Sequence, residues 1–361
     1  GNEIVYVPCH RSHIDYLLLS YVVYRNGLAC PHIAAGLNHN LPLLGTIQRR
    51  GGAFFLRRSF RDNPLYAAVF YKYLSLYLAK GVPFEYFIEG GRSRTGRLRP
   101  ARPGMLSMTV RSFVRRPARP LVFVPVYFGY ERLIEGESYL SELSGKAKER
   151  ESLLGLLRGL KVLRSRFGKV YVNFGDPIPL AGVLDEARPG WQAEAAASDE
   201  RPAWVQGVVR DLGNRILTGI NSVAAVNPVA LLATVLLSTP KRSILETDLR
   251  RMLELHLALI DGAPYGPGVT RSELTARQII DYGEQFGLLQ RRTHKLGDII
   301  WLEERSAILA SYFRNNVAHI MALPSLLACA FFDRPELPVA DLKDTVARVY
   351  PYLRSELFIH W

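Results

Sequence analysis

The sequence predicts an α/β fold with a mostly parallel central sheet flanked by helices, followed by a mainly helical C-terminal region that carries a β-hairpin. Over the first half of the chain, short apolar runs alternate with longer helical patterns, an order typical of parallel sheets. Beyond residue 203 helical patterns dominate. We expect residues 1–184 to form the α/β domain, 185–202 a linker or surface excursion, and 203–361 a helical domain.

Five apolar runs in the first half fit strands, at residues 4–8, 53–56, 84–88, 121–128 and 169–174. Between them, apolar residues recur with helical spacing at residues 15–25, 63–80, 103–115 and 138–166. In a parallel sheet, functional residues gather at the carboxyl ends of the strands. The residues that follow each apolar run are therefore the candidates for a site.

An uncharged stretch of 25 residues, 216–240, lies between Arg215 and Lys241. This length could span a bilayer. Asn221, Asn227 and Pro228 interrupt it, and polar groups are costly inside a membrane. We expect a buried helical hairpin or a membrane-surface element in preference to a transmembrane helix.

Further along, residues 271–286 fit a helix, residues 288–292 and 298–302 fit strands, and Lys295-Leu296-Gly297 fits the turn between them. A helix followed by a basic hairpin resembles a winged-helix arrangement, which could bind nucleic acid. A small structural module is the commoner role of such a unit, so we expect no nucleic-acid partner. A final helix is expected at residues 303–323.

The net charge of +13 and the isoelectric point near 9.7 predict attraction to an anionic partner, such as anionic lipid, a phosphorylated substrate or an acidic carrier protein. The three cysteines are widely spaced, so we expect neither a disulfide framework nor a metal knuckle, and a reducing compartment. Cys9 is expected to be a buried apolar residue of a strand. The chain starts without a signal peptide, so we expect it to be part of a longer protein.

The most informative segment is Cys9-His10-Arg11-Ser12-His13-Ile14-Asp15, directly after the first apolar run. A turn into the following helix can fold the Asp15 carboxylate back onto the His10 imidazole. The carboxylate then accepts the Nδ1 proton and leaves Nε2 as a general base. No enzyme serine is needed if the substrate supplies the hydroxyl.

Three further blocks follow strand-like runs. In the second, Gly51-Gly52-Ala53-Phe54-Phe55-Leu56-Arg57-Arg58, two arginines leave a strand end and can bind a dianionic phosphate. In the third, Glu89-Gly90-Gly91-Arg92-Ser93-Arg94, two glycines permit a tight turn and the basic residues form an anion nest. In the fourth, Pro125 marks a bulge or bend and could line an apolar channel or lie in the core.

The order of these four blocks resembles that of the glycerolipid acyltransferases, and within them the membrane-bound bacterial glycerol-3-phosphate 1-O-acyltransferases. Residues 171–177, Tyr-Val-Asn-Phe-Gly-Asp-Pro, and residues 312–319, Tyr-Phe-Arg-Asn-Asn-Val-Ala-His, are also similar to that family. The resemblance covers most of the chain. The chain lacks the family's long N-terminal helical region, so we expect it to be the catalytic and C-terminal portion of such a protein.

The resemblance implies the glycerolipid acyltransferase fold, and transfer of a fatty acyl group from acyl carrier protein or coenzyme A to the sn-1 hydroxyl of glycerol 3-phosphate. His10 would be the base and Asp15 its orienting carboxylate. The substrate-binding residues would be Phe55, Arg57, Arg58, Glu89, Gly90, Gly91, Arg92, Ser93, Arg94 and Pro125. No cofactor or metal is implied. The protein would act at the cytoplasmic face of the bacterial inner membrane, as a peripheral or monotopic protein on anionic lipid.

Two other functions stay open from the residues alone. The acceptor could be dihydroxyacetone phosphate or lysophosphatidate, which a panel of substrates would decide. Alternatively, His10, His13 and Asp15 mimic the ligand cluster of a metallohydrolase. That function needs more His or Asp ligands at the following strand ends, where the sequence offers arginines instead.

Overall fold

The computed structural model describes residues 2–37, 44–57, 63–136, 139–140, 168–197 and 202–359. The chain forms two compact units, which are described separately below. The first comprises residues 1–92, 99–127 and 174–220, and the second comprises residues 93–98, 128–173 and 221–361. The domain boundaries expected at residues 184 and 203 stay a prediction.

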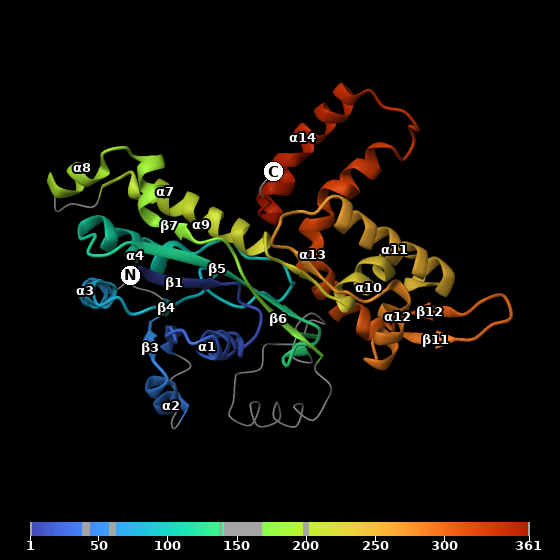
Figure 1. Cartoon of the computed structure of the whole chain (residues 1–361), viewed down its shortest axis with the longest axis horizontal. Coiled ribbons are helices and arrows are strands. Elements are labelled where there is room, and N and C mark those ends of the chain that lie inside the picture. Colours follow the sequence, from blue (N-terminus) through green and yellow to red (C-terminus); the bar gives the residue numbers. More distant parts are fainter. Residues whose placement is uncertain are drawn as a thin grey trace. The chain divides into compact units, whose positions relative to one another are not determined.

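A seven-stranded sheet forms the framework, in the order β3-β2-β4-β1-β5-β6, with β7 paired to β5 (Figure 1). Its strands are β1 (Glu3–Pro8), β2 (His32–Gly36), β3 (Ala53–Leu56), β4 (Phe84–Glu85), β5 (Leu121–Tyr130), β6 (Val170–Phe174) and β7 (Ile178–Pro179). The four pairings among β1 to β5 are all parallel, and β7 is antiparallel to β5. The predicted mixed α/β fold with a mostly parallel sheet is confirmed.

Three of the expected helices are present in the first unit as α1 (Asp15–Arg25), α3 (Pro64–Ala79) and α4 (Pro103–Arg115). Asn63 caps α3 by accepting a hydrogen bond from the Tyr66 amide at 2.9 Å. Right-handed crossovers place α1 and α2 (Leu44–Arg50) on one face of the sheet, and α3 and α4 on the other. α7 (Leu180–Ala187), α8 (Trp191–Ala197) and α9 (Val205–Asn221) follow β7. The helix expected at 138–166 lies outside the described residues, except for Tyr139 and Leu140.

β4 and β2 show the clearest differences from the expected strands. β4 was expected over residues 84–88, but it ends at Glu85 because the chain turns there, with the Gly90 amide donating to the Phe87 carbonyl. β2 was not predicted at all. Its sequence, His-Ile-Ala-Ala-Gly, contains one large apolar residue and lacks the apolar run of a buried strand.

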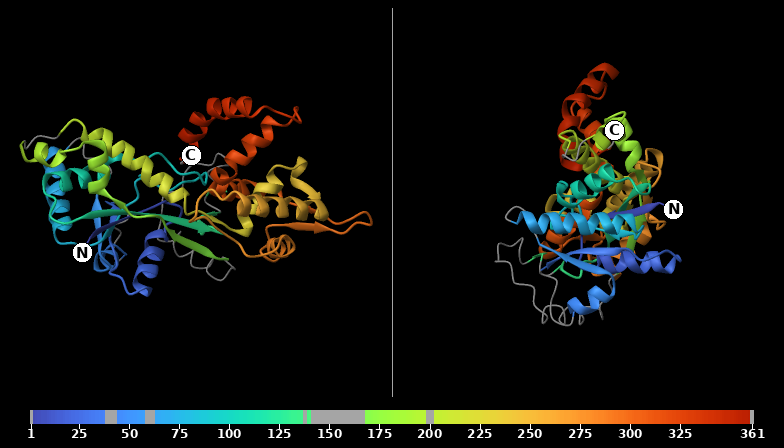
Figure 2. Two further views of the ribbon diagram at one scale, coloured as in Figure 1. Left: turned by 45° about the horizontal axis from the view of Figure 1, so that its top comes forward. Right: turned by 90° about the vertical axis from the view of Figure 1, so that its left-hand side faces the viewer.

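The second unit is mainly helical, as expected (Figure 2). Its helices are α10 (Pro228–Leu237), α11 (Glu246–Gly262), α12 (Ala276–Gln285), α13 (Glu304–Ala330) and α14 (Val339–Leu357). α10 packs against α11, α12 and α13, and nearly all of its side chains are buried. Two short strands pair in parallel in this unit. β8 (Ala225–Val226) comes directly before α10, and β10 (Thr270–Arg271) lies between α11 and α12.

The uncharged stretch 216–240 is therefore not one continuous helix. It comprises the end of α9, the strand β8 and the buried helix α10, which confirms its expected buried character. Within the part of the chain that the structure describes, no helix combines the length and the apolar character needed to cross a membrane.

The expected hairpin is also present, as β11 (Gln290–Arg292) and β12 (Ile299–Trp301), with β9 (Ser243–Leu245) as a third antiparallel strand. Arg291 donates to Glu284 at 2.6 Å and to Asp298 at 2.7 Å, and it also donates to Glu246. Three carboxylates thus neutralise this arginine, so its charge serves the packing of the hairpin and not the binding of an anion.

Glu85 is an unusual residue for the centre of a sheet. It lies on β4 between β1 and β2, and its side chain is fully buried. Neither of its carboxyl oxygens has a hydrogen-bond partner among the described residues. Burial raises the pKa of Glu85 well above its ordinary value of 4.5, and the charge of Asp15 raises it further. The folded protein therefore holds Glu85 in its neutral form.

The substitution Glu85→Gln tests this state through the pH dependence of stability. As pH rises from about 4.5 towards the raised pKa, the unfolded chain releases the Glu85 proton and the folded chain keeps it, so wild-type stability falls in this window. Gln has no such proton to lose. We expect the stability of the variant relative to wild type to increase with pH, as measured by urea midpoints at several pH values. If the difference in stability between the variant and the wild type does not change with pH, Glu85 is ionised in the folded protein.

Candidate active site

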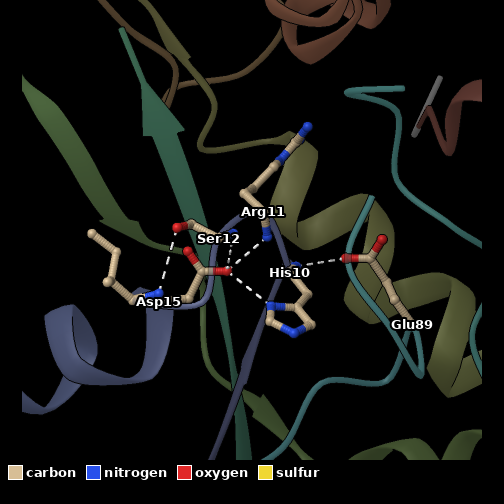
Figure 3. Close-up of polar contacts among 6 residues, drawn as sticks. His10, Arg11, Ser12, Asp15 and Glu89 are labelled. Atoms are coloured by element: carbon tan, nitrogen blue, oxygen red, sulfur yellow. Dashed lines mark hydrogen bonds and ion pairs between the residues drawn. The ribbon is translucent and has the colours of Figure 1, made fainter. Parts of the chain in front are cut away.

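The turn between β1 and α1 is organised around one carboxylate, as Figure 3 shows. Asp15 Oδ2 lies 3.0 Å from His10 Nδ1, and it accepts hydrogen bonds from the backbone amides of Arg11 at 2.6 Å and Ser12 at 2.9 Å. Asp15 is fully buried, whereas 17% of the His10 side chain is exposed. Because a carboxylate only accepts, Nδ1 carries the proton and the Nε2 lone pair is directed away from Asp15.

A second carboxylate holds the backbone of His10. Glu89 Oε1 accepts from the His10 amide and Glu89 Oε2 accepts from the Arg99 amide, each at 2.8 Å. Glu89 is buried, and this burial raises its pKa to about 7, against the opposing effect of Arg11. Gly90 follows with φ = +65°, a left-handed conformation that favours glycine and lets the loop turn back.

The His10 ring is also fixed from its side. It stacks on Phe87, with the ring centroids 3.9 Å apart and the planes at 22°. Next to it lies a cavity of about 70 Å³, lined by His10, His13, Tyr16, Gln48, Phe87 and small or apolar residues of β2 and β3. The cavity thus lies where it can admit a substrate hydroxyl next to the His10 ring.

The register of the sheet explains why these residues meet. Tyr6, Glu85, Ile33 and Ala53 lie in one row across β1, β4, β2 and β3. Four positions beyond this row, the chain reaches His10 after β1, Glu89 after β4 and Arg57 after β3. The three blocks that contain them thus converge on the carboxyl edge of the sheet, as the sequence predicts.

Of the substrate-binding residues expected in the second block, Phe55 and Arg57 lie at this edge but not beside His10. β3 is three strand spacings from β1, or about 14 Å. The Arg57 guanidinium lies 5.1 Å from the ring centre of Tyr66, and the Phe55 ring lies 5.1 Å from the Arg49 guanidinium. Arg58 lies outside the described residues.

The third block is divided between the two units. Gly90, Gly91 and Arg92 belong to the first, whereas Ser93 and Arg94 belong to the second. Ser93 Oγ donates to the Arg97 carbonyl at 2.5 Å, which closes the loop on itself. The structure therefore brings Glu89 and Gly90 to His10, and the contribution of Ser93 and Arg94 to this site stays a prediction.

Two motifs in the second unit have contacts that explain them structurally. In α13, Asn315 Nδ2 donates to the Thr95 carbonyl at 2.7 Å and so holds the segment 93–98. In the strand β6, Asn173 Nδ2 donates to the Val223 carbonyl at 2.8 Å and to Thr270 Oγ1 at 3.0 Å. These motifs stabilise the second unit.

Pro125 lies on β5 beside Val7 of β1 and is buried. Its carbonyl accepts from the Gly175 amide at 2.8 Å, and its ring faces Gly175 and Gly219 closely enough that a Cβ on Gly219 would collide with it. Packing thus accounts for Pro125, and its expected role in substrate binding has no contact here that supports it.

Three residues of the cavity were not predicted. Phe87 was within the third block but carried no expected role, although it lies two residues before Glu89. Tyr16 and Gln48 form a hydrogen bond of 3.1 Å, and the other amide atom of Gln48, Oε1, is buried without a hydrogen-bond partner among the described residues. Gln48 gives no signal in the sequence, because it belongs to a short helix that the pattern did not reveal.

The metallohydrolase alternative finds little support in the geometry. Asp15 Oδ2 is already occupied by the His10 ring and two amides. Across residues 2–359, leaving aside the segments that the structure does not describe, no three His, Cys, Asp or Glu side chains gather into a group that could hold a metal ion.

Comparisons with known proteins identify relatives along the whole chain. The family model of the glycerol-3-phosphate acyltransferase C-terminal region matches residues 139–361, and the acyltransferase family model matches residues 1–129. The glycerol-3-phosphate acyltransferases of Pseudomonas putida (strain W619) and Ectopseudomonas mendocina (strain ymp) are 50% and 49% identical to the chain over 361 residues. Those residues are 100% of this chain and 44% of each relative, so the chain spans less than half of their length.

A solved structure is also similar, the crystal structure of the 1-acyl-sn-glycerophosphate (LPA) acyltransferase PlsC from Thermotoga maritima. It is 16% identical, with a TM-score of 0.30 over 60% of this chain and 67% of that chain. The curated relatives, half identical over every residue of the chain, carry the assignment: the chain belongs to the glycerol-3-phosphate acyltransferase family.

Proposed function

We propose that the protein transfers a fatty acyl group from acyl carrier protein or coenzyme A to the sn-1 hydroxyl of glycerol 3-phosphate, giving lysophosphatidate for phospholipid synthesis. The observation that carries this proposal is the His10–Asp15 pair at the mouth of the cavity, with Asp15 buried and hydrogen-bonded three times. The identity to glycerol-3-phosphate acyltransferases supports the choice of acceptor.

In the proposed reaction, His10 Nε2 takes the proton of the substrate hydroxyl as its oxygen attacks the thioester carbonyl. Asp15 stabilises the imidazolium that forms. The tetrahedral intermediate then breaks its carbon–sulfur bond, and the leaving thiol takes the proton back from His10. The new ester keeps the acyl group and the enzyme ends unchanged, so no acyl-enzyme is needed.

The acceptor would lie with its hydroxyl end in the cavity and its phosphate outside. Gln48 and Tyr16, which are hydrogen-bonded to each other, line the cavity that would receive this end of the acceptor. Arg57, Arg58, Arg92 and Arg94 would bind the phosphate, with Ser93. Dihydroxyacetone phosphate has a carbonyl in place of one hydroxyl, and lysophosphatidate already carries an acyl chain, so rates with the three acceptors would separate the alternatives.

The net charge of +13 supports the proposed setting, a peripheral position on anionic lipid at the cytoplasmic face of the bacterial inner membrane. The same charge suits both thioester donors, since acyl carrier protein and coenzyme A are acidic. We propose no cofactor, and the thioester is a co-substrate.

Substitution of the base pair tests the mechanism directly. We expect His10→Ala and Asp15→Asn to lower the turnover number by roughly 100- to 10,000-fold, because each removes the positioned base or its tautomer control. The assay is thiol release from palmitoyl-coenzyme A that depends on glycerol 3-phosphate. Circular dichroism would confirm folding. Turnover within tenfold of wild type in either folded variant would refute the assignment of the base.

Glu89→Gln tests the anchoring of the His10 backbone. The amide oxygen can replace one carboxyl oxygen, but its NH2 group would face the amide of His10 or Arg99, which also donates. We expect turnover to fall by roughly tenfold or more with little change in the KM for glycerol 3-phosphate, since the base is displaced and the phosphate site is not. A change in KM alone would instead place Glu89 at the acceptor.

Arg57→Ala tests the phosphate site, with Arg50→Ala on α2 as the matched control, because both arginines are exposed. A charge-assisted hydrogen bond contributes about 1.5–3 kcal/mol, so we expect the KM for glycerol 3-phosphate to rise roughly 10- to 100-fold in Arg57→Ala only. If the KM for the acyl donor changes instead, Arg57 serves the thioester and not the phosphate.

A further inference from the structure

The outer face of α3 is apolar, which is unusual for a surface helix. Leu65, Val69 and Leu76 are 75%, 59% and 52% exposed, and Tyr73 is also exposed. Their spacing of three or four residues places them along one side of the helix, opposite the buried Phe70, Leu74 and Leu78. The right-hand view of Figure 2 shows α3 along the near side of the first unit. We call this set, Leu65, Val69, Tyr73 and Leu76, the α3 stripe.

Beside the α3 stripe lies a groove of about 470 Å³ between α3 and α4. Its rim is basic, with Lys72 on α3, Arg115 at the end of α4, and Arg116 and Arg119 in the segment that follows. Residues 63–83 and 99–127, which include both helices, contain no Asp or Glu. The layer thus combines an apolar stripe with an excess of positive charge, the combination that binds anionic membrane surfaces.

The floor of the groove is polar and includes an acid. Glu3, at the start of β1, is buried, and its Oε1 has no hydrogen-bond partner among the residues that the structure describes. Burial raises the pKa of Glu3 to about 7, with Arg119 opposing this shift. Ser112 Oγ and Ser75 Oγ, 2.8 Å apart, add hydroxyls to the same groove. The basic rim, and not this floor, therefore supplies the charge that binds a lipid phosphate.

For one residue of the basic rim, Arg115, stabilisation of the helix dipole is a simpler explanation than lipid binding. Arg115 is in the last turn of α4, where a cation is favourable without any ligand. This explanation does not extend to the α3 stripe. Exposed apolar side chains in a continuous row lower solubility unless a partner covers them.

We propose that the α3 stripe and the basic groove beside it are the surface by which this protein docks on an anionic phospholipid bilayer. The stripe enters the acyl boundary, and the rim of the groove binds a lipid phosphate. The inference rests on the proposed function only for the choice of a lipid partner, because binding to vesicles needs no acyl transfer.

The test measures binding of the full-length protein to phosphatidylcholine vesicles with and without phosphatidylglycerol. One variant carries Val69→Glu and Leu76→Glu, and a second carries Arg116→Glu and Arg119→Glu. The matched controls lie in the second unit: the exposed leucine pair Leu255→Glu and Leu259→Glu, and the arginine pair Arg251→Glu and Arg277→Glu, each with the same change of charge as its test variant. All four substitution sets are at exposed positions, and thermal unfolding would confirm that each variant folds.

We expect the stripe and groove variants each to bind anionic vesicles about thirtyfold more weakly, and the controls to stay within a few-fold of wild type. The groove variant should also lose the preference for phosphatidylglycerol. Equal losses in the control arginine pair would overturn the proposal in favour of bulk charge. Unchanged binding in both test variants would overturn it as well.

A labelling experiment separates the bilayer from another occupant of this surface. Leu76→Cys would be combined with Cys30→Ser and Cys329→Ser, which remove the exposed native thiols. We expect a thiol reagent to label the introduced cysteine rapidly in solution and slowly in the presence of anionic vesicles. Protection without vesicles would mean that protein covers the stripe, which overturns the proposal. If the wild type binds vesicles but transfers no acyl group in detergent, the proposed function fails and the docking surface stands.

Discussion

The candidate site depends on the burial of one carboxylate, Asp15. A buried charge is costly unless several hydrogen bonds replace its water, and Asp15 obtains them from the His10 ring and from the amides of Arg11 and Ser12. Those two amides lie in the turn between β1 and α1, so satisfying the charge also sets the path of the chain. The orientation of the base and the start of α1 are thus consequences of one requirement.

Glu89 extends the same principle from the ring to the backbone. Its two oxygens join the end of β1, at His10, to the loop after β4, at Arg99, so two neighbouring strands of the sheet hold the base in place. Phe87 restricts the remaining rotation of the ring by stacking. A site built on the ends of adjacent strands is more rigid than one on a free loop, and proton transfer depends on such positioning.

The sequence predicted local features better than distant ones. The helices Asp15–Arg25 and Pro103–Arg115 match their expected bounds, because the apolar period and the flanking residues define them locally. The His10–Asp15 contact was also predictable, since it spans five residues. Glu89 was expected among the substrate-binding residues, but it accepts from the His10 amide, 79 residues away, a pairing that only the strand order creates. Gln48 could not be predicted, because the cavity it lines needs three segments to meet.

The direction of α3 connects the docking surface with the chemistry. α3 begins at Pro64, seven residues after Arg57 at the end of β3, and ends before the amino end of β4, so the α3 stripe runs from the carboxyl edge of the sheet towards the basic groove. The proposed product carries a long acyl chain, and exposing such a chain to water costs ~0.8 kcal/mol per methylene, or on the order of 10 kcal/mol in total. A bilayer on the α3 stripe would lie on the face of the sheet opposite α1 and α2, and it would approach the carboxyl edge only at the N-terminal end of α3. Lipid near that end would shorten the path of the acyl chain through water, which gives the apolar face of α3 a physical reason.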